Sequence, residues 1–128
     1  MNIPGNVKYT KDHEWIRLEE SGDTAIVGIT DYAQGELGDI VFVEIETIGE
    51  ILKKGDVFGT IEAVKTVSDL FMPASGEVIA INEKLNDTPE MINNDPFNAG
   101  WLIKVKLTDT SELNSLLSAD QYQELISA

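Results

Sequence analysis

One lysine, Lys65, lies near the middle of the stretch GDVFGTIEAVKTVSDLFMPASGEV, which runs from Gly55 to Val78. Strand-forming residues precede and follow it, and a Gly-acid pair closes each half. Because glycine suits the positive-φ positions of tight turns, we expect a folded-back hairpin with these glycines at its outer corners and Lys65 at its tip. An amine held in water at such a tip is accessible to a modifying enzyme, and a group attached there can reach several partners. A carrier needs this geometry, but most exposed lysines are only solvated charges, and the spacing alone does not separate the two.

The composition fits one globular domain, residues 1–128, rich in turns, with 42% hydrophobic residues and 10 glycines. The absence of cysteine excludes disulfides, thiolate metal sites and a cysteine nucleophile, so any sulfur redox chemistry must come from an added group. No apolar run reaches membrane-spanning length, and neither a signal peptide nor a transit peptide is visible. We therefore expect a cytoplasmic protein.

The net charge is −14, from 23 acidic and 9 basic side chains. Such a chain repels phosphates, so nucleic acid and an anionic membrane surface are disfavoured as partners. Solubility alone accounts for this negative charge. The same charge would also steer the protein toward enzymes with basic docking surfaces.

Alternating apolar and polar residues predict most of the elements that must position Lys65. The predicted strands outside the central hairpin are His13–Leu18, Thr24–Ile29, Ile40–Ile45, Glu77–Asn82 and Trp101–Leu107. A short helix is expected over Tyr32–Leu37, capped by Thr30 or Asp31, and two short helices are expected after residue 108. Many short strands separated by turns indicate a mainly β protein, a sandwich or flattened barrel of two small sheets.

Several blocks of sequence resemble one known family over almost the whole chain. They are KYTKDHEW, VGITDYAQGELGDIVFVE, EAVKTVSD with PASGEV, DPFNAGWLIKVKL and SELNSLLSADQY. Together they look like the H protein family of the glycine cleavage system. The resemblance implies a flattened β-barrel or sandwich of the lipoyl/biotinyl attachment type, built on a hammerhead hairpin, with a short internal helix and a short helical C-terminal tail.

By this resemblance, Lys65 carries one lipoyl group, attached covalently as an amide. The protein would be a non-catalytic carrier, and we expect a monomer. It would shuttle the aminomethyl group of glycine from the P protein, a pyridoxal-phosphate glycine decarboxylase, to the T protein, a tetrahydrofolate-dependent aminomethyltransferase. The L protein, a dihydrolipoamide dehydrogenase, would reoxidise the dithiol, and a lipoate-attaching enzyme would be a further partner.

Two acidic positions that match the family, Glu14 in HEW and Asp69 in SD, form a second candidate group. The aminomethyl group on the arm is cationic at neutral pH and prone to hydrolysis. Carboxylates can hold such an ammonium group while an apolar wall excludes water, and we assign these tasks to a cleft containing Glu14 and Asp69. Glu62 and Asp69 are also candidates for recognition by the modifying enzyme.

Other readings predict different features. Biotin carriers usually place methionines beside the modified lysine, whereas Val64 and Thr66 flank it here. A lipoyl domain of a dehydrogenase complex predicts a linker and further domains. A stand-alone enzyme predicts converging catalytic side chains, and the lone His13 without cysteine provides neither these nor a metal site. An H-like relay that transfers lipoate or serves another pathway remains an alternative.

Overall fold

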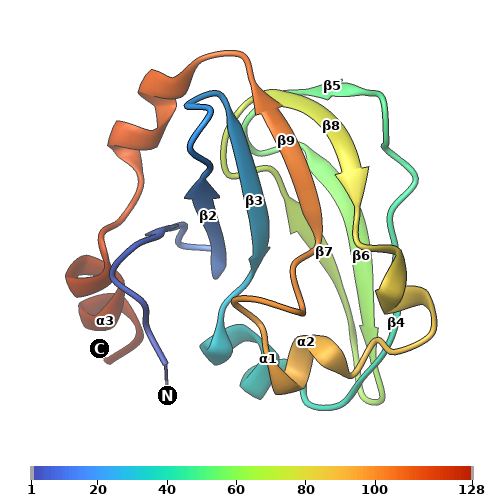
Figure 1. The fold of residues 1–128 in the computed structure, drawn as a ribbon. Helices are drawn as coiled ribbons and strands as arrows, with labels where there is room; N and C mark the ends of the chain where they lie inside the picture. Colours follow the sequence, from blue (N-terminus) through green and yellow to red (C-terminus); the bar gives the residue numbers. More distant parts are fainter. Residues whose placement is uncertain (1, 128) are drawn as a thin grey trace.

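Two antiparallel β-sheets form the body of the protein in a computed structural model that describes residues 2–127 (Figure 1). The larger sheet has the strand order β1 (Lys8–Tyr9), β2 (Glu14–Leu18), β3 (Thr24–Ile29), β9 (Ile103–Leu107), β8 (Gly76–Ile81) and β5 (Ile51–Leu52). The smaller sheet has the order β4 (Ile40–Glu44), β6 (Val57–Ala63) and β7 (Val67–Phe71). The predicted mainly β fold is confirmed, although the two sheets are unequal, with six and three strands.

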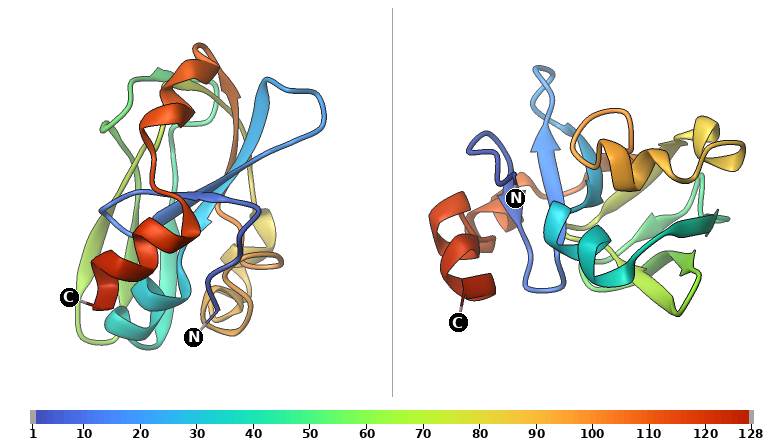
Figure 2. Two further views of the ribbon diagram at one scale, coloured as in Figure 1. Left: turned by 90° about the vertical axis from the view of Figure 1, so that its left-hand side faces the viewer. Right: turned by 90° about the horizontal axis from the view of Figure 1, so that it is seen from below.

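Short helices occupy the connections between strands and the C-terminal tail. They are α1 (Asp31–Leu37), α2 (Met91–Asn94), α3 (Ala119–Ser127) and the 3-10 helices η1 (Glu83–Asn86) and η2 (Thr110–Ser115). The turn between β6 and β7 lies at the same end of the molecule as α1 and α2, and β5 lies at the opposite end (Figures 1 and 2). None of the helices within residues 2–127 has the length and apolar character needed to cross a bilayer.

Apolar side chains that alternate along the strands form the main core, to which both sheets contribute. A second, aromatic cluster lies beneath α3 and contains Val7, Tyr9, Trp15, Phe97 and Tyr122. Tyr122, fully buried, stacks on Tyr9 with ring centroids 4.6 Å apart. The C-terminal helix is therefore attached to the β1–β2 hairpin by aromatic packing.

The prediction that Gly55 and Gly76 form matching corners is only half right. Gly55 has a φ of +92° and lies in a turn, as expected. Gly76 is the first residue of β8, where an added Cβ would clash with Val105 Cγ1 and lie 2.5 Å from the Lys106 carbonyl oxygen. Close approach of β9, which no local pattern reveals, makes glycine necessary there.

The two predicted helix starts in the tail differ in their caps. Ser118 and Gln121 form the reciprocal capping box, since Gln121 N donates to Ser118 Oγ and Ser118 N donates to Gln121 Oε1. Glu112, predicted to cap with Asp109, instead accepts hydrogen bonds from Ser75 N and Ser75 Oγ. This tertiary contact fixes η2 against the turn between β7 and β8.

Candidate functional site

Lys65 lies in the tight turn between β6 and β7. Glu62 pairs with Val67 across the hairpin, and Ala63 N donates to the carbonyl oxygen of Thr66 at 2.8 Å. The Lys65 side chain is exposed. The hairpin therefore presents the amine at one end of the molecule, where Figure 1 shows the β6–β7 turn.

The end of α1 supports this turn. Gly38 terminates the helix with a φ of +80°, a conformation that favours glycine, and its N–H donates to Gln34 O. The next residue, Asp39, accepts a hydrogen bond from Val64 N at 3.0 Å. A Cβ added at Gly38 would lie 3.4 Å from Lys65 Cε, so the lysine side chain passes close to the end of α1.

Asn93 of α2 fixes the backbone beneath the lysine, and the sequence analysis missed it. Its Nδ2 donates to Gly38 O at 2.9 Å and to Gln34 Oε1 at 3.0 Å, while its Oδ1 accepts from Ile40 N at 3.0 Å. It lies in an Asn- and Asp-rich stretch between β8 and β9. Nothing in the local sequence distinguishes an asparagine that hydrogen-bonds to distant backbone from one that is solvated.

The amine of Lys65 has no acidic partner among residues 2–127. The one ion pair within 4.0 Å in that range joins Lys104 to Glu19 at 3.7 Å. An exposed, unpaired amine is accessible for acylation, because forming an amide there breaks no existing contact and needs no buried charge to be left unpaired.

A cavity of about 360 Å³, which we call the α1–β7 cavity, opens between α1, the start of β2 and β7. Its apolar lining residues are Ile29, Ala33, Leu37, Ile61 and Leu70, and its polar ones are Asp12, His13, Glu14, Tyr32, Glu36, Ser68 and Asp69. The C-terminal end of α1 lies close to the Lys65 side chain, and β7 begins at the turn that bears it. A flexible arm on that lysine could fold back along them.

Glu14 and Asp69, predicted to act together, line this same cavity but occupy different environments. Glu14 is only 2% exposed, with Oε1 accepting from Thr10 Oγ1 at 2.9 Å and Oε2 from Phe71 N at 3.2 Å. Asp69 is exposed at the edge strand. A cationic group in the cavity would therefore meet a buried carboxylate and a solvated one.

Burial raises the pKa of Glu14 to about 7, even though hydrogen bonds from Phe71 N and Thr10 Oγ1 act to lower it. The negative charge of Asp12 adds to the increase. A carboxyl group with this pKa titrates near neutrality when the cavity is empty. An ammonium group beside it would favour the ionised form and so keep Glu14 charged.

This pKa makes a prediction about folding stability. The folded-state pKa lies above the ordinary value of 4.5, so Glu14 contributes stability that is complete below pH 4.5 and is lost as the pH rises through about 7. Between pH 5 and pH 8 we expect the unfolding free energy of the parent, relative to that of Glu14→Gln, to fall by about 2–3 kcal/mol.

Urea unfolding of both proteins at several pH values measures this difference. Burial lowers the pKa of His13, which gives a pH dependence of opposite sign, but that contribution is present in both proteins and cancels. Glu124→Gln, a change at an exposed position of α3, serves as the control and should follow the parent. A parent-to-Glu14→Gln difference that does not vary with pH would contradict the prediction.

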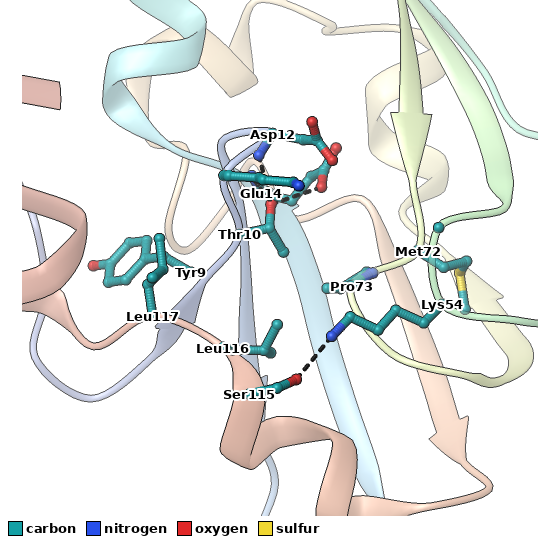
Figure 3. A pocket seen from close by; sticks show the side chains of 12 residues that line it. Tyr9, Thr10, Asp12, Glu14, Lys54, Met72, Pro73, Ser115, Leu116 and Leu117 are labelled. Atoms are coloured by element: carbon teal, nitrogen blue, oxygen red, sulfur yellow. Dashed lines mark hydrogen bonds between the residues drawn. The ribbon is translucent and has the colours of Figure 1, made fainter. Parts of the chain in front are cut away.

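A second cavity, of about 520 Å³, is also lined by Asp12 and Glu14 (Figure 3). We call it the Lys54 cavity. The Lys54 side chain extends across it and donates from Nζ to Ser115 Oγ of η2 at 2.8 Å, and Glu14 points toward it beside Thr10 and Asp12. It contains Met72 and Pro73, farther from the turn than the β7 residues of the first cavity, and it lacks Asp69.

His13 was predicted to begin a strand, and this is wrong. It lies just before β2 in the loop, with a φ of +69°, and its ring forms part of the α1–β7 cavity wall. Within residues 2–127 no three His, Asp or Glu side chains are grouped so that they could hold a metal ion.

A β-hairpin with an exposed lysine at its tip, on a two-sheet β fold, defines a carrier of the lipoyl/biotinyl attachment class. Residues 7–128 match the family described as Glycine cleavage H-protein. The chain is 59% identical to the glycine cleavage system H protein of Bacteroides fragilis and 56% identical to that of Chlorobium phaeobacteroides, in both cases over the full length of both chains.

A solved structure gives the same result. The crystal structure of a glycine cleavage system H protein from Mycobacterium marinum matches with a TM-score of 0.89 and 41% sequence identity, over 98% of this chain and all of that one. The chain belongs to the glycine cleavage H-protein family. The function of this family is that of the lipoyl carrier of the glycine cleavage system.

Proposed function

We propose that Lys65 is the attachment residue and bears one lipoyl group as an amide on its amine. The observation that carries this proposal is the exposed, unpaired lysine at the tip of the β6–β7 hairpin, within the stretch that resembles the family's lipoyl-lysine region. The bound lipoyl group would supply a disulfide that accepts the aminomethyl group and is afterwards regenerated by oxidation. The chain itself would supply reach, orientation and shielding.

The partners follow from this role. The P protein loads the arm, the T protein unloads it to tetrahydrofolate, the L protein reoxidises it, and a lipoate-attaching enzyme installs it. A cofactor tethered at an exposed hairpin meets each active site at a high effective concentration while the body of the carrier docks transiently. The net charge of −14 is compatible with enzymes that present basic docking surfaces.

Between these encounters the loaded arm would lie in the α1–β7 cavity. Glu14 and Asp69 would hold the ammonium group of the cargo, and the apolar residues of α1 and β7 would limit the access of water. Glu14 would contribute more than Asp69 to binding the ammonium group, because it is buried and a charge-assisted hydrogen bond is stronger where water does not screen it. Glu62 and Asp69, both exposed near the turn, would also be read by the attaching enzyme.

We further propose that the protein is non-catalytic, with the chemistry left to its partners, and that residues 1–128 form one carrier domain, monomeric and cytoplasmic. A continuous hydrophobic cluster that contains residues from both sheets supports the single domain.

Reconstitution separates this function from the alternative lipoyl relay. The lipoylated protein is mixed with the P, T and L proteins, labelled glycine, tetrahydrofolate and NAD, and labelled carbon dioxide is measured. The proposed carrier gives continuous turnover. A protein that is lipoylated at Lys65 yet gives no carbon dioxide would instead be a relay for another pathway.

A further inference from the structure

His13 has an unusual backbone conformation at the wall of the α1–β7 cavity. It is the last residue of the three-residue loop 11–13 between β1 and β2, which Thr10 N closes by donating to Glu14 O at 2.9 Å. The last position of such loops is left-handed and favours glycine. Among residues 2–127, His13 alone adopts a positive φ without being glycine. A positive φ costs free energy for a residue with a side chain, so a histidine at this position indicates that its ring has a function.

The ring of His13 is held from outside the cavity by the C-terminal helix. His13 Nδ1 lies 2.9 Å from Tyr122 Oη, and the same hydroxyl lies 2.7 Å from Thr30 Oγ1. Thr30 is the N-cap of α1 and accepts from Ala33 N through that oxygen. The buried Tyr122 hydroxyl thus connects the loop before Glu14 to the start of α1, which forms the opposite wall of the α1–β7 cavity.

The ring lies between this hydroxyl and the cavity. His13 packs against Tyr32 of α1 with ring centroids 4.8 Å apart, and both residues line the cavity beside Glu14. Tyr122 itself is fully buried, stacked on Tyr9, and does not line the cavity. Its influence on a bound arm therefore passes through His13 and Thr30.

We propose that Tyr122 is a positioning residue for the loaded arm: through its hydroxyl, the C-terminal helix holds His13 and the start of α1 in the arrangement that excludes water from the α1–β7 cavity. This inference rests on the proposed function, since it concerns the aminomethyl group carried by the arm. The reaction to be suppressed is hydrolysis. Water replaces sulfur at the aminomethyl carbon: a carbon–oxygen bond forms, the carbon–sulfur bond breaks with its electron pair remaining on sulfur, and the sulfur takes a proton from the water to become a thiol. The carbon–nitrogen bond of the resulting aminomethanol then breaks with its electron pair on nitrogen, which takes the hydroxyl proton, so that formaldehyde and ammonium result.

The test uses the loaded, lipoylated protein and measures formaldehyde release in the absence of the T protein. Tyr122→Phe removes only the hydroxyl, and release is expected to accelerate roughly three- to tenfold, because the contacts of that hydroxyl with His13 and Thr30 are lost. Tyr9→Phe is the matched control. It removes the hydroxyl of the stacked partner, which donates to Pro4 O and has no contact with His13. Equal rates of formaldehyde release from Tyr122→Phe and Tyr9→Phe would overturn the inference, because a general loosening of α3 would then explain both.

A double-variant comparison tests the route through His13. His13→Gly keeps the left-handed backbone and removes the ring. On this background Tyr122→Phe should accelerate release by a smaller factor than it does in the parent, because one of the two contacts is already gone. The same factor on both backgrounds would show that Tyr122 acts independently of His13 and would overturn the proposed route.

A measurement on the unlipoylated protein separates this inference from the proposed function. Because the chain has one histidine, its imidazole nitrogens give a single set of signals in a ¹H–¹⁵N spectrum. Tyr122→Phe should shift the Nδ1 signal and Tyr9→Phe should not. An unchanged Nδ1 signal in Tyr122→Phe would overturn the inference whatever Lys65 carries, whereas a missing lipoyl group on the parent would overturn the proposed function alone.

Discussion

Replacing Lys65 by arginine is expected to abolish both lipoylation and glycine turnover. Arginine keeps the positive charge and the exposed position, but its guanidinium group stays protonated and is not a substrate for amide formation. The intact mass of the parent should show a lipoyl-sized increment that Lys65→Arg lacks. In the reconstituted system, release of labelled carbon dioxide from the variant should fall to the level measured with no carrier added.

Lys53→Arg is the matched control, because Lys53 is also an exposed lysine of a turn and the substitution is identical. This variant should keep the mass increment and full turnover. Undiminished glycine cleavage by Lys65→Arg, or a lipoyl group on that variant, would contradict the proposed attachment residue. Circular dichroism and thermal unfolding should be unchanged in both variants, since neither lysine is buried.

Removal of the two cavity carboxylates is expected to shorten the lifetime of the loaded arm. In a protein carrying Glu14→Ala and Asp69→Ala, the aminomethyl group loses both anionic partners; the hydrogen bond to buried Glu14 is worth about 1.5–3 kcal/mol, and the one to solvated Asp69 about 1 kcal/mol or less. Release of formaldehyde and ammonia should therefore be roughly tenfold faster or more. Among single conservative variants, Glu14→Gln should accelerate release more than Asp69→Asn does, because Glu14 is buried and Asp69 is solvated.

Glu44→Gln provides the comparison for Asp69→Asn. Glu44 pairs with Thr60, and Thr60 pairs with Asp69, so the two acids lie in one cross-strand row of the smaller sheet. Both are exposed, but only Asp69 lines the α1–β7 cavity. Glu44→Gln should thus leave release unchanged. A loaded protein with both cavity carboxylates replaced that keeps its cargo as long as the parent would exclude the cavity as the resting place of the arm.

The larger part of the fold could be predicted from local sequence. Period-two runs identified the strands because one face of each packs on the core and the other meets water. Thr30 was a candidate cap of α1, and its hydroxyl does accept from Ala33 N. The 3-10 helix η1 was not predicted, since its single buried residue, Leu85, provides no periodic signal.

Lys65 was the strongest site prediction from sequence because a tip lysine depends on its own hairpin, whose two strands are adjacent in the chain. Glu14 and Asp69 were linked only by the family resemblance. Their shared cavity depends on β2 approaching the edge of β7, which brings Glu14 Oε2 to the Phe71 N–H. The burial that raises the pKa of Glu14 follows from the same approach.

The sequence by itself determined the family, the strands and the lysine presented at the hairpin tip, because these depend on residues close together in the chain or on blocks that can be read directly. The tertiary structure alone decided the contacts of Asn93, His13 and Tyr122, whose hydrogen bonds join segments far apart in sequence. The sequence around an asparagine, histidine or tyrosine is the same whether its side chain is solvated or buried against a distant partner. Only packing of the complete chain shows which of these groups are buried and what they contact.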